Sequence, residues 1–140
     1  MKKIVITGAA GFIGKHLVEA LQDDNELVLI DDLSTGDQHF LEQHPHVITD
    51  LQDPLYLEAD VVYHLAAITD TQYERPRKQY KLNIQATKTV MDMAVRCDAK
   101  LIYASSAAIY GNEPTYCPTA VIGNISLLNG NSSTIQTMAK

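Results

Sequence analysis

The sequence predicts an α/β domain with a doubly wound parallel sheet, and three observations support this fold class. Short apolar runs alternate with longer segments of helical periodicity, without an internal repeat. The runs lack clean polar/apolar alternation, which is typical of parallel strands covered on both faces. The first run leads into three regularly spaced glycines, Gly8, Gly11 and Gly14. The crossovers should be right-handed, and we expect the strand order 3-2-1-4-5.

Length and composition are those of an ordinary globular domain. Of the 140 residues, 46% are hydrophobic and 20% are charged, and no apolar run reaches the ~18 residues of a membrane span. A formal net charge of −6 argues against nucleic acid or an anionic membrane as a partner. The N-terminus leads straight into a strand without a signal-peptide pattern, so we expect a cytoplasmic protein. Cys97 and Cys117 lack metal-type spacing and are interpreted as incidental thiols.

The first unit is a strand over residues 3–7, a glycine loop and a helix. Gly8 would supply the tight turn, Gly11 would let the backbone approach a pyrophosphate, and Gly14 would let the helix pack closely on the strand. The N–H groups of the loop and the helix dipole would face an anion. Such glycines also occur at ordinary turns, so the interpretation depends on its context. Helical periodicity continues to Leu21.

The second strand, Leu27–Ile30, ends at Asp31, twenty residues after Gly11. A carboxylate at this place can accept hydrogen bonds from an adenosine ribose, whereas it would repel a 2′-phosphate. The sequence therefore predicts NAD rather than NADP, and the alternative for Asp31 is a solvated loop acid. The polar segment Asp32–Gly36 would wrap the ribose, and a short helix is expected over 37–43.

The third and fourth strands are expected at Val47–Asp50 and Val61–Leu65. The fourth ends in the small residues Ala66 and Ala67, which would leave room for a cofactor or, equally, allow tight helix–sheet packing. His64 has no ligand-spaced partner, so we interpret it as structural rather than catalytic or metal-binding.

A long helix is expected over residues 77–95, with Pro76 in its first turn. The face predicted to pack on the sheet carries Tyr80, Ile84, Thr87, Met91, Ala94 and Val95. The fifth strand, Lys100–Ala104, delivers Ser105 and Ser106 to the carboxyl end of the sheet, where ligands bind in such folds. We expect the cofactor crevice between the first and fourth strands.

Several motifs, in the correct order and spacing, resemble those of the extended short-chain dehydrogenases/reductases, and among them the nucleotide-sugar epimerases and dehydratases. The matching segments are Thr7–Gly14, Asp31–Gly36, Asp50-Leu51, His64–Ala67, Asn83 and Ser105–Gly111. The resemblance implies a Rossmann domain that binds NAD over residues 1–114.

The resemblance also implies a role for each matching residue. The pyrophosphate would be held by Gly8, Gly11, Phe12, Ile13 and Gly14, and the adenosine ribose by Asp31, Asp32, Leu33, Ser34, Thr35 and Gly36. The adenine would lie beside Asp50 and Leu51. The path to the nicotinamide ribose would be lined by Leu65, Ala66 and Ala67, with Thr69 as a further candidate. Asn83 matches a position that is associated with hydrogen bonding on the cofactor side. Ser106 matches the catalytic hydroxyl that polarises the reacting oxygen of the substrate.

Two features of the family have no counterpart here. The family uses a Tyr followed four residues later by a Lys as acid/base, but Tyr110 and Tyr116 are followed at that distance by Pro114 and Ala120. The resemblance also implies a C-terminal lobe that binds the nucleotide-sugar, and we expect no counterpart of it in these 140 residues. We therefore expect an NAD-binding domain that is inactive by itself, with an exposed face that invites self-association. Residues 115–140 would be an atypical tail rather than the family's native continuation.

Two further functions are compatible with the same residues. The chain could be a regulatory module that senses NAD, or an enzyme that borrows the Tyr and Lys from another subunit. The tail could result from a change of reading frame, from natural truncation or from an artificial boundary.

Overall fold

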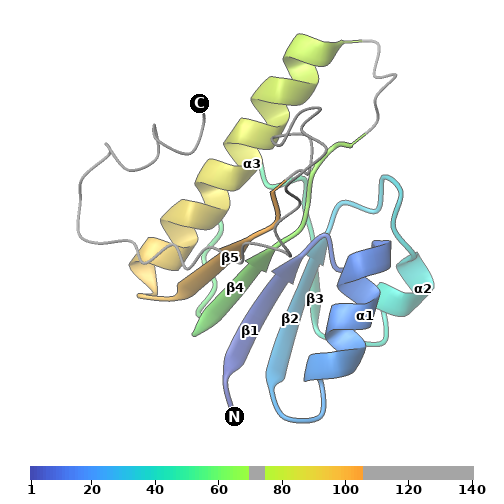
Figure 1. The fold of residues 1–140 in the computed structure, drawn as a ribbon, viewed down its shortest axis with the longest axis vertical. Coiled ribbons are helices and arrows are strands. Elements are labelled where there is room, and N and C mark those ends of the chain that lie inside the picture. Colours follow the sequence, from blue (N-terminus) through green and yellow to red (C-terminus); the bar gives the residue numbers. More distant parts are fainter. Residues whose placement is uncertain (70–74, 106–140) are drawn as a thin grey trace, which may run out of the picture.

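The computed structural model describes residues 1–69 and 75–105 and contains a five-stranded parallel sheet (Figure 1). In chain order the elements are β1 (Lys3–Thr7), α1 (Phe12–Leu21), β2 (Glu26–Asp31), α2 (Gln38–Leu41), β3 (His46–Ile48), β4 (Val61–His64), α3 (Pro76–Arg96) and β5 (Lys100–Tyr103). The strand order is β3-β2-β1-β4-β5. The predicted fold class and strand order are therefore confirmed.

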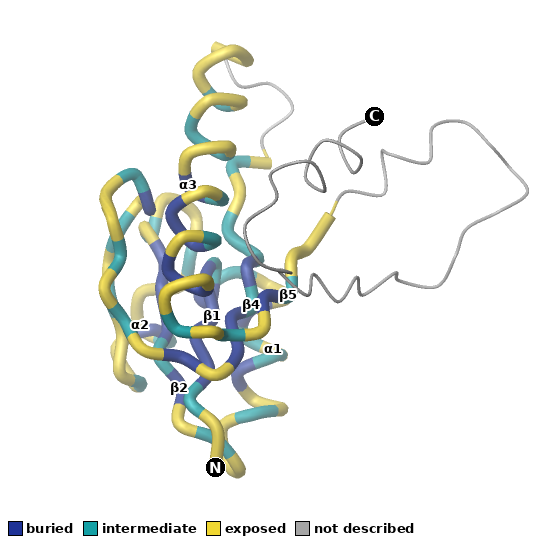
Figure 2. Tube along the Cα trace, turned by 90° about the vertical axis from the view of Figure 1, so that its left-hand side faces the viewer, coloured by how far each residue is buried: buried dark blue, intermediate teal, exposed yellow. Residues whose placement is uncertain are grey.

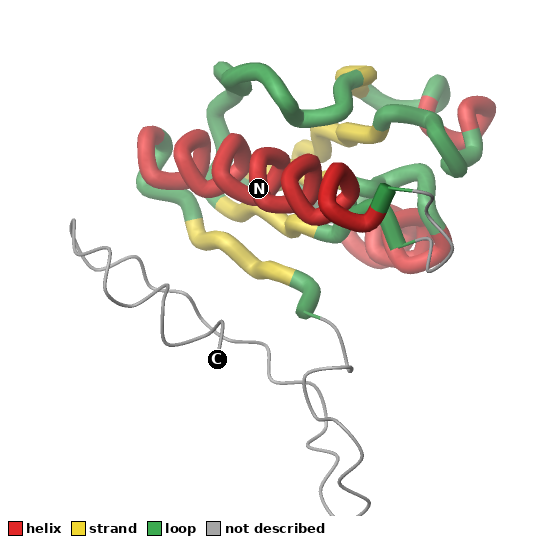
Figure 3. The backbone as a smooth tube through the Cα atoms, turned by 90° about the horizontal axis from the view of Figure 1, so that it is seen from above, coloured by secondary structure: helices red, strands yellow, loops and turns green. Residues whose placement is uncertain are grey.

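Both faces of the sheet are covered, because successive side chains of a strand point to opposite faces. On β1, Val5 belongs to the apolar cluster formed with α3. Its neighbours Ile4 and Ile6 belong to a second cluster, which includes Val18 of α1 and Leu41 of α2. Figure 3 shows α3 running along the strands, with the two shorter helices lying away from it. The sheet is thus buried on both sides, as the unbroken apolar runs predict.

The helix α3 meets the sheet with only part of the predicted face: Met91 packs against the core, and Thr87 bonds to His64 of β4. Of the predicted face, Ala94 is buried, but Tyr80 is 68% exposed and Val95 is also exposed. The buried residues of α3 are Ala86, Thr89, Val90, Met93 and Ala94. The predicted face was partly wrong because two adjoining stripes of this helix share the same spacing, and periodicity alone does not say which one meets the sheet.

Element ends differ from the prediction by small shifts. The strand β3 ends at Ile48 rather than at residue 50, because the chain then turns through Leu51, which has a φ of 60°. The side chain of Leu51 is buried in the core. Helix α2 is shorter than expected and begins after Asp37, whose carboxylate accepts the N–H of Phe40.

Burial is highest in the middle of the sheet. In Figure 2 the dark blue of buried residues follows the central strands and the inner side of α3, while the first turns of α3 are mostly exposed. Across residues 1–69 and 75–105, no helix combines the length and the apolar character that crossing a membrane requires.

Candidate cofactor site

A cavity of about 560 Å³ opens at the carboxyl end of the sheet. Its walls come from the glycine loop after β1, the loops after β2, β3 and β4, and helix α3. The volume lies within the range of small-molecule and cofactor sites. The central strand β1 pairs with β2 on one side and with β4 on the other, so the cavity lies at the point where strand order reverses. This is the expected position of the crevice.

Two glycines shape the loop above the cavity. Gly8 has a φ of 70°, which favours glycine, and an added Cβ would lie 2.8 Å from the backbone nitrogen of Ala66. Gly11 is the N-cap of α1, and its added Cβ would meet only the carbonyl oxygen of Gly8, at 3.3 Å. Gly8 is therefore needed for the loop itself, whereas a side chain at Gly11 would enter the space that Gly11 leaves open.

Gly14 brings α1 against the glycine loop. An added Cβ would collide with the carbonyl oxygen of Gly8 and would lie 2.6 Å from that of Ala9. Helix α1 therefore packs closely against Gly8 and Ala9, in the loop that follows β1, whereas the prediction placed this contact on the strand itself. It places the first turn of α1 over the cavity.

The first turn of α1 presents free backbone N–H groups to the cavity. Within the described residues, the N–H groups of Phe12, Ile13 and Gly14 have no protein acceptor. The helix has neither a side-chain cap nor an acidic residue in this turn. Phe12 is 79% exposed, and Ile13 is exposed as well. Unpaired N–H groups at the positive end of a helix dipole form an anion site, so these residues fit the pyrophosphate of a dinucleotide.

Asp31 joins two walls of the cavity. Its Oδ2 accepts the N–H of Ala10 at 3.0 Å, and its Oδ1 accepts the N–H of Leu33 at 2.9 Å. The side chain is only 9% exposed, which excludes the solvated loop acid. Because a carboxylate has about four acceptor positions, Asp31 keeps capacity for the hydroxyl groups of a ribose.

The loop after β2 is folded tightly over the glycine loop. The N–H of Asp37 donates to the carbonyl oxygen of Ala10 at 3.1 Å. At Gly36 an added Cβ would lie 2.7 Å from the Cβ of Ala10 and 2.8 Å from Oδ1 of Asp31. Leu33 has a φ of 58° and packs against the cluster under α1, so it does not line the cavity.

The opposite wall consists of the loop after β4 and of α3. Asn83 holds this loop through both groups of its amide: Oδ1 accepts the N–H of Ile68 at 2.8 Å, and Nδ2 donates to the carbonyl oxygen of Ile68 at 3.1 Å. Asn83 lines the cavity, but its hydrogen bonds are made to the protein. Gln79 also donates to the carbonyl oxygen of Ile68.

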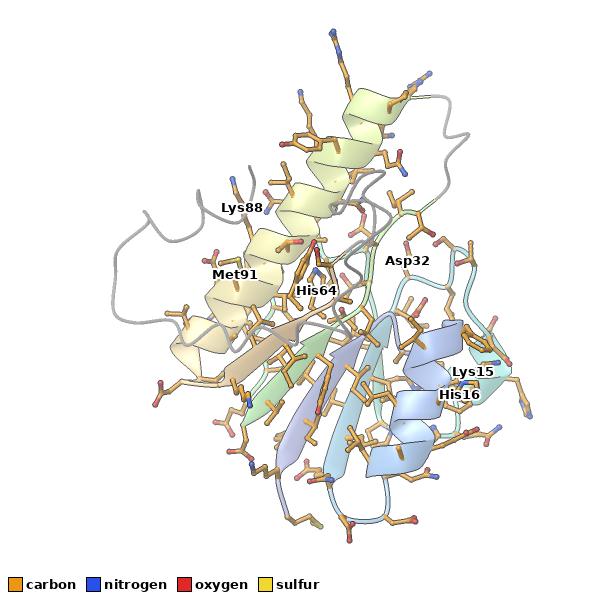
Figure 4. The ribbon with its side chains drawn as sticks, in the orientation of Figure 1. Lys15, His16, Asp32, His64, Lys88 and Met91 are labelled. Atoms are coloured by element: carbon orange, nitrogen blue, oxygen red, sulfur yellow. The ribbon has the colours of Figure 1, made fainter. Side chains whose placement is uncertain are left out.

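His64, at the end of β4, is 1% exposed and lies between the sheet and α3 (Figure 4). Burial lowers its pKa to about 4, so the ring is neutral at physiological pH. Thr7 and Thr87 hydrogen-bond to its two nitrogens. Within residues 1–69 and 75–105, no three His, Cys, Asp or Glu side chains are grouped to hold a metal ion. The structure agrees with a structural role for His64.

Most of the predicted cofactor residues surround this one cavity. Those that line it are Gly8, Gly11, Phe12, Ile13, Gly14, Asp31, Asp32, Ser34, Thr35, Gly36, Asp50, Leu51, Leu65, Ala66, Ala67, Thr69 and Asn83. Sequence reasoning missed further lining residues, which are Ile30, Thr49, Gln52, Ile68, Leu82, Ala86 and Ala104. Most of them adjoin a predicted residue in the chain, and Ala86 lies three residues after Asn83 on α3. Helical spacing from Asn83 could have identified it.

The predicted catalytic residue, Ser106, lies outside the described residues, as do Tyr110, Tyr116, Cys117 and the tail 115–140. Ala104 lines the cavity two residues before Ser106. Ser105 is the last described residue of this segment and is exposed.

Comparison with known proteins agrees with this geometry. The sequence matches the NAD dependent epimerase/dehydratase family over residues 4–127. The chain belongs to this family. It is 36% identical over 124 residues to UDP-glucuronic acid decarboxylase 1 of Danio rerio, covering 82% of the chain and 30% of the relative. The ADP-L-glycero-D-manno-heptose-6-epimerase of Cupriavidus pinatubonensis is 34% identical over 130 residues, which cover 81% of the chain and 38% of the relative.

Solved structures show the same relationship. The chain superimposes on the UDP-N-acetylglucosamine 4-epimerase of Methanobrevibacter ruminantium with a TM-score of 0.74 and 34% identity, covering 88% of the chain and 43% of that structure. The Thermus thermophilus UDP-glucose 4-epimerase, solved with NAD, gives a TM-score of 0.70 and 26% identity, covering 85% and 42%. The chain thus spans less than half the length of these relatives. The resemblance to nucleotide-sugar epimerases and dehydratases, and NAD as the cofactor of the family, are confirmed.

Proposed function

We propose that this chain binds NAD as the cofactor domain of a nucleotide-sugar epimerase or dehydratase. The observation that carries the proposal is the row of unpaired N–H groups on Phe12, Ile13 and Gly14, which faces a cavity that Gly11 leaves open. A pyrophosphate supplies the acceptors that these groups lack, and hydrogen bonds to a charged acceptor are worth about 1.5–3 kcal/mol each.

The other parts of the cavity match the remaining parts of the dinucleotide. Asp31 has free acceptor capacity for the adenosine ribose, and the segment 50–52 with Leu82 offers a wall for the adenine. Ala66 and Ala67 leave room at the other end for the nicotinamide ribose. When bound, NAD would accept a hydride from a sugar carbon and return it.

Charge at the ribose end favours NAD over NADP. Asp31 and Asp32 both line the cavity, and no Lys or Arg does so among the described residues. A 2′-phosphate would face these carboxylates without a compensating cation. The domain would therefore discriminate against NADP because its carboxylates repel the 2′-phosphate.

The reaction itself needs groups beyond the described cavity. Ser106 would polarise the reacting oxygen of the sugar, and a Tyr with a Lys four residues later would move the proton. The chain has no such pair. We propose that residues 1–114 bind the cofactor and that the chain alone does not turn over a nucleotide-sugar.

Calorimetric titration of the whole chain with NAD and NADP tests the cofactor. We expect NAD to bind at least tenfold more tightly, and equal or tighter NADP binding would contradict the role of Asp31. Gly11→Leu should abolish NAD binding while the fold survives, because the side chain would occupy the volume of the pyrophosphate. Ser106→Ala is the control, and its NAD affinity should stay within about twofold because its predicted partner is the substrate.

A turnover assay with UDP-sugars separates an enzyme completed by another subunit from the other two functions that the sequence leaves open. No turnover with or without partner chains, together with NAD binding, supports an inactive cofactor domain or a sensor. Turnover that appears only when a second chain supplies the Tyr and Lys supports an enzyme completed by another subunit. Cytoplasmic location, self-association and the lack of a nucleic-acid partner stay predictions.

A further inference from the structure

A single chain of hydrogen bonds runs through the buried ring of His64. It begins at the N–H of Ala66, which donates to Oγ1 of Thr7 at 3.2 Å. Oγ1 of Thr7 lies 2.7 Å from Nδ1 of His64, and Nε2 of His64 lies 3.2 Å from Oγ1 of Thr87. Oγ1 of Thr87 then donates to the carbonyl oxygen of Asn83 at 2.9 Å. The chain links β1, β4 and α3.

The two ends of this chain determine which ring nitrogen carries the proton. Thr87 uses its only hydroxyl proton on the carbonyl oxygen of Asn83, so Nε2 of His64 must be the donor to Thr87. A neutral imidazole then has an acceptor at Nδ1, which takes the proton of the Thr7 hydroxyl. Each hydroxyl donates one bond and accepts one.

The opposite tautomer would leave this chain incomplete. If Nδ1 carried the proton, the hydroxyl of Thr7 would accept from both His64 and Ala66. Its own proton would have no acceptor within residues 1–69 and 75–105, in a side chain that is fully buried. An unsatisfied buried donor is costly, so the contacts favour the tautomer with the proton on Nε2.

The chain of hydrogen bonds ends at Ala66, in the loop that forms one wall of the cavity. Leu65, Ala66, Ala67, Ile68 and Thr69 all line it. Leu65 is held by a backbone bond to the carbonyl oxygen of Thr7, and Ile68 is held by Asn83. Ala66 lies between these two anchors, and its N–H bonds to the Thr7 hydroxyl. Its backbone also touches the glycine loop, because an added Cβ at Gly8 would lie 2.8 Å from its nitrogen. A shift of Ala66 would therefore disturb both walls.

We propose that His64 is a positioning residue of the cofactor site: as the neutral tautomer with the proton on Nε2, it orients the Thr7 hydroxyl toward itself and so fixes the N–H of Ala66. This inference rests on the proposed NAD site. His64 does not touch the cavity, so it acts through Thr7 and Ala66.

The first test needs neither a variant nor NAD. Long-range ¹H–¹⁵N correlation spectra of the ¹⁵N-labelled chain distinguish the protonated from the unprotonated ring nitrogen. We expect His64 to carry its proton on Nε2, with Nδ1 unprotonated. A proton on Nδ1, or an even mixture of the two tautomers, would overturn the proposal.

The second test removes the hydroxyl next to the ring. Thr7→Val keeps the shape of the side chain but removes the bond to Ala66, so amide exchange of Ala66 should accelerate at least tenfold. The amide of Leu65, which bonds to a backbone oxygen, should be unchanged and serves as an internal control. NAD affinity should fall about tenfold, as expected for one lost hydrogen bond. Unchanged exchange of Ala66 would contradict the proposal.

Three further variants keep the test decisive. Thr7→Ser restores the hydroxyl and should restore both the protection of Ala66 and the NAD affinity. Thr89→Val removes a buried hydroxyl of α3 that lies outside the chain of hydrogen bonds. It should change neither the amide protection of Ala66 nor the NAD affinity. If Thr7→Val does not fold, Thr87→Val tests the other end: with the acceptor of Nε2 lost, the proton should partly move to Nδ1, and an unchanged tautomer would overturn the proposal.

If the original chain shows the expected tautomer and protection but binds no NAD, the proposed function fails rather than the hydrogen-bond chain.

Discussion

The two walls of the cavity are held in place by different kinds of interaction. On the side of the glycine loop, backbone groups bond to each other and to one carboxylate, that of Asp31, and glycines allow the close contacts. On the side of α3, side chains make the connections, through His64 and Asn83. The first wall is therefore sensitive to added atoms, and the second to the loss of donors and acceptors.

The two walls differ accordingly in where their sequence can vary. Backbone contacts leave no space for a Cβ but do not depend on the identity of most side chains. The wall along α3 depends on hydroxyl, imidazole and amide groups at particular places, and an apolar residue of similar shape would break it. Four predictions test this difference, from the largest expected effect to the smallest.

Gly14→Ala should have the largest effect, because its Cβ would collide with two backbone carbonyl groups that cannot move independently of the loop. We expect a loss of about 3 kcal/mol or more in the free energy of unfolding, measured by urea denaturation. Gly11→Ala is the matched control, and its unfolding free energy should change by less than about 1 kcal/mol. Similar losses in both variants would show that the glycine loop adjusts more freely than its contacts suggest.

Acidification should act on the wall along α3 through His64. Its pKa is about 4 in the folded chain and about 6.5 when unfolded, so the unfolded state takes up its proton first. The contribution of His64 to the free energy of unfolding is therefore complete above pH 6.5 and falls as the pH decreases toward 4. It amounts to about 3 kcal/mol. Thr7 and Thr87 hydrogen-bond to the ring, and the ring of Tyr103 lies beside it.

The measurement compares the free energy of unfolding of the chain and of His64→Gln from pH 7 to pH 4. The difference between them should shrink steadily with acidification, because the variant lacks the titrating group. A constant difference would mean that His64 is protonated in the folded state as well.

Asp31→Asn should weaken the glycine-loop wall by an intermediate amount. The amide has one oxygen, so it can accept from Ala10 or from Leu33 but presents an NH₂ group to the other N–H. We expect a loss of about 2 kcal/mol in the free energy of unfolding and a smaller preference for NAD over NADP. Asp32→Asn is the control for the free energy of unfolding, because among the described residues Asp32 bonds only to Ser34, within its own exposed turn. Equal losses would indicate a general effect of charge.

Loss of the exposed ion pair between Lys15 and Asp37 should have the smallest effect of the four changes. The N–H of Phe40, followed by the ammonium of Lys15 at 3.1 Å, holds the pKa of Asp37 below its usual value. Lys15→Gln should therefore raise the pKa of Asp37 only part of the way, because the N–H of Phe40 remains. An NMR titration of the Asp37 carboxyl would measure this shift. A full return to the ordinary value would show that Lys15 is the main cause.

The glycine-loop wall was predictable because its determinants are local. Glycine spacing, the apolar runs and the distance from Gly11 to Asp31 follow directly from short stretches of sequence. The strand order is that of the Rossmann fold, which the glycine loop and the acidic residue twenty positions after Gly11 indicate. The family supplied the roles of Phe12 and Ile13, and the unpaired N–H groups of α1 give those roles a physical basis.

The wall along α3 was less predictable, because its determinants lie far apart in the chain. Thr7 and His64 are 57 residues apart, and His64 and Thr87 are 23 residues apart. Nothing in the local sequence shows that these groups meet. The buried face of α3 was predicted only in part for the same reason, since two stripes compete and only contact with the sheet selects one.

The sequence by itself determined the layers of this domain and the glycine loop, because strand burial, helical periodicity and tight turns depend on neighbours in the chain. Only the tertiary structure decided which face of α3 is buried, that Asp31 joins two loops, and that Leu33 points away from the cavity. It also decided the partners of His64. The physical reason is that each of these outcomes depends on how separate elements pack, which no local pattern records.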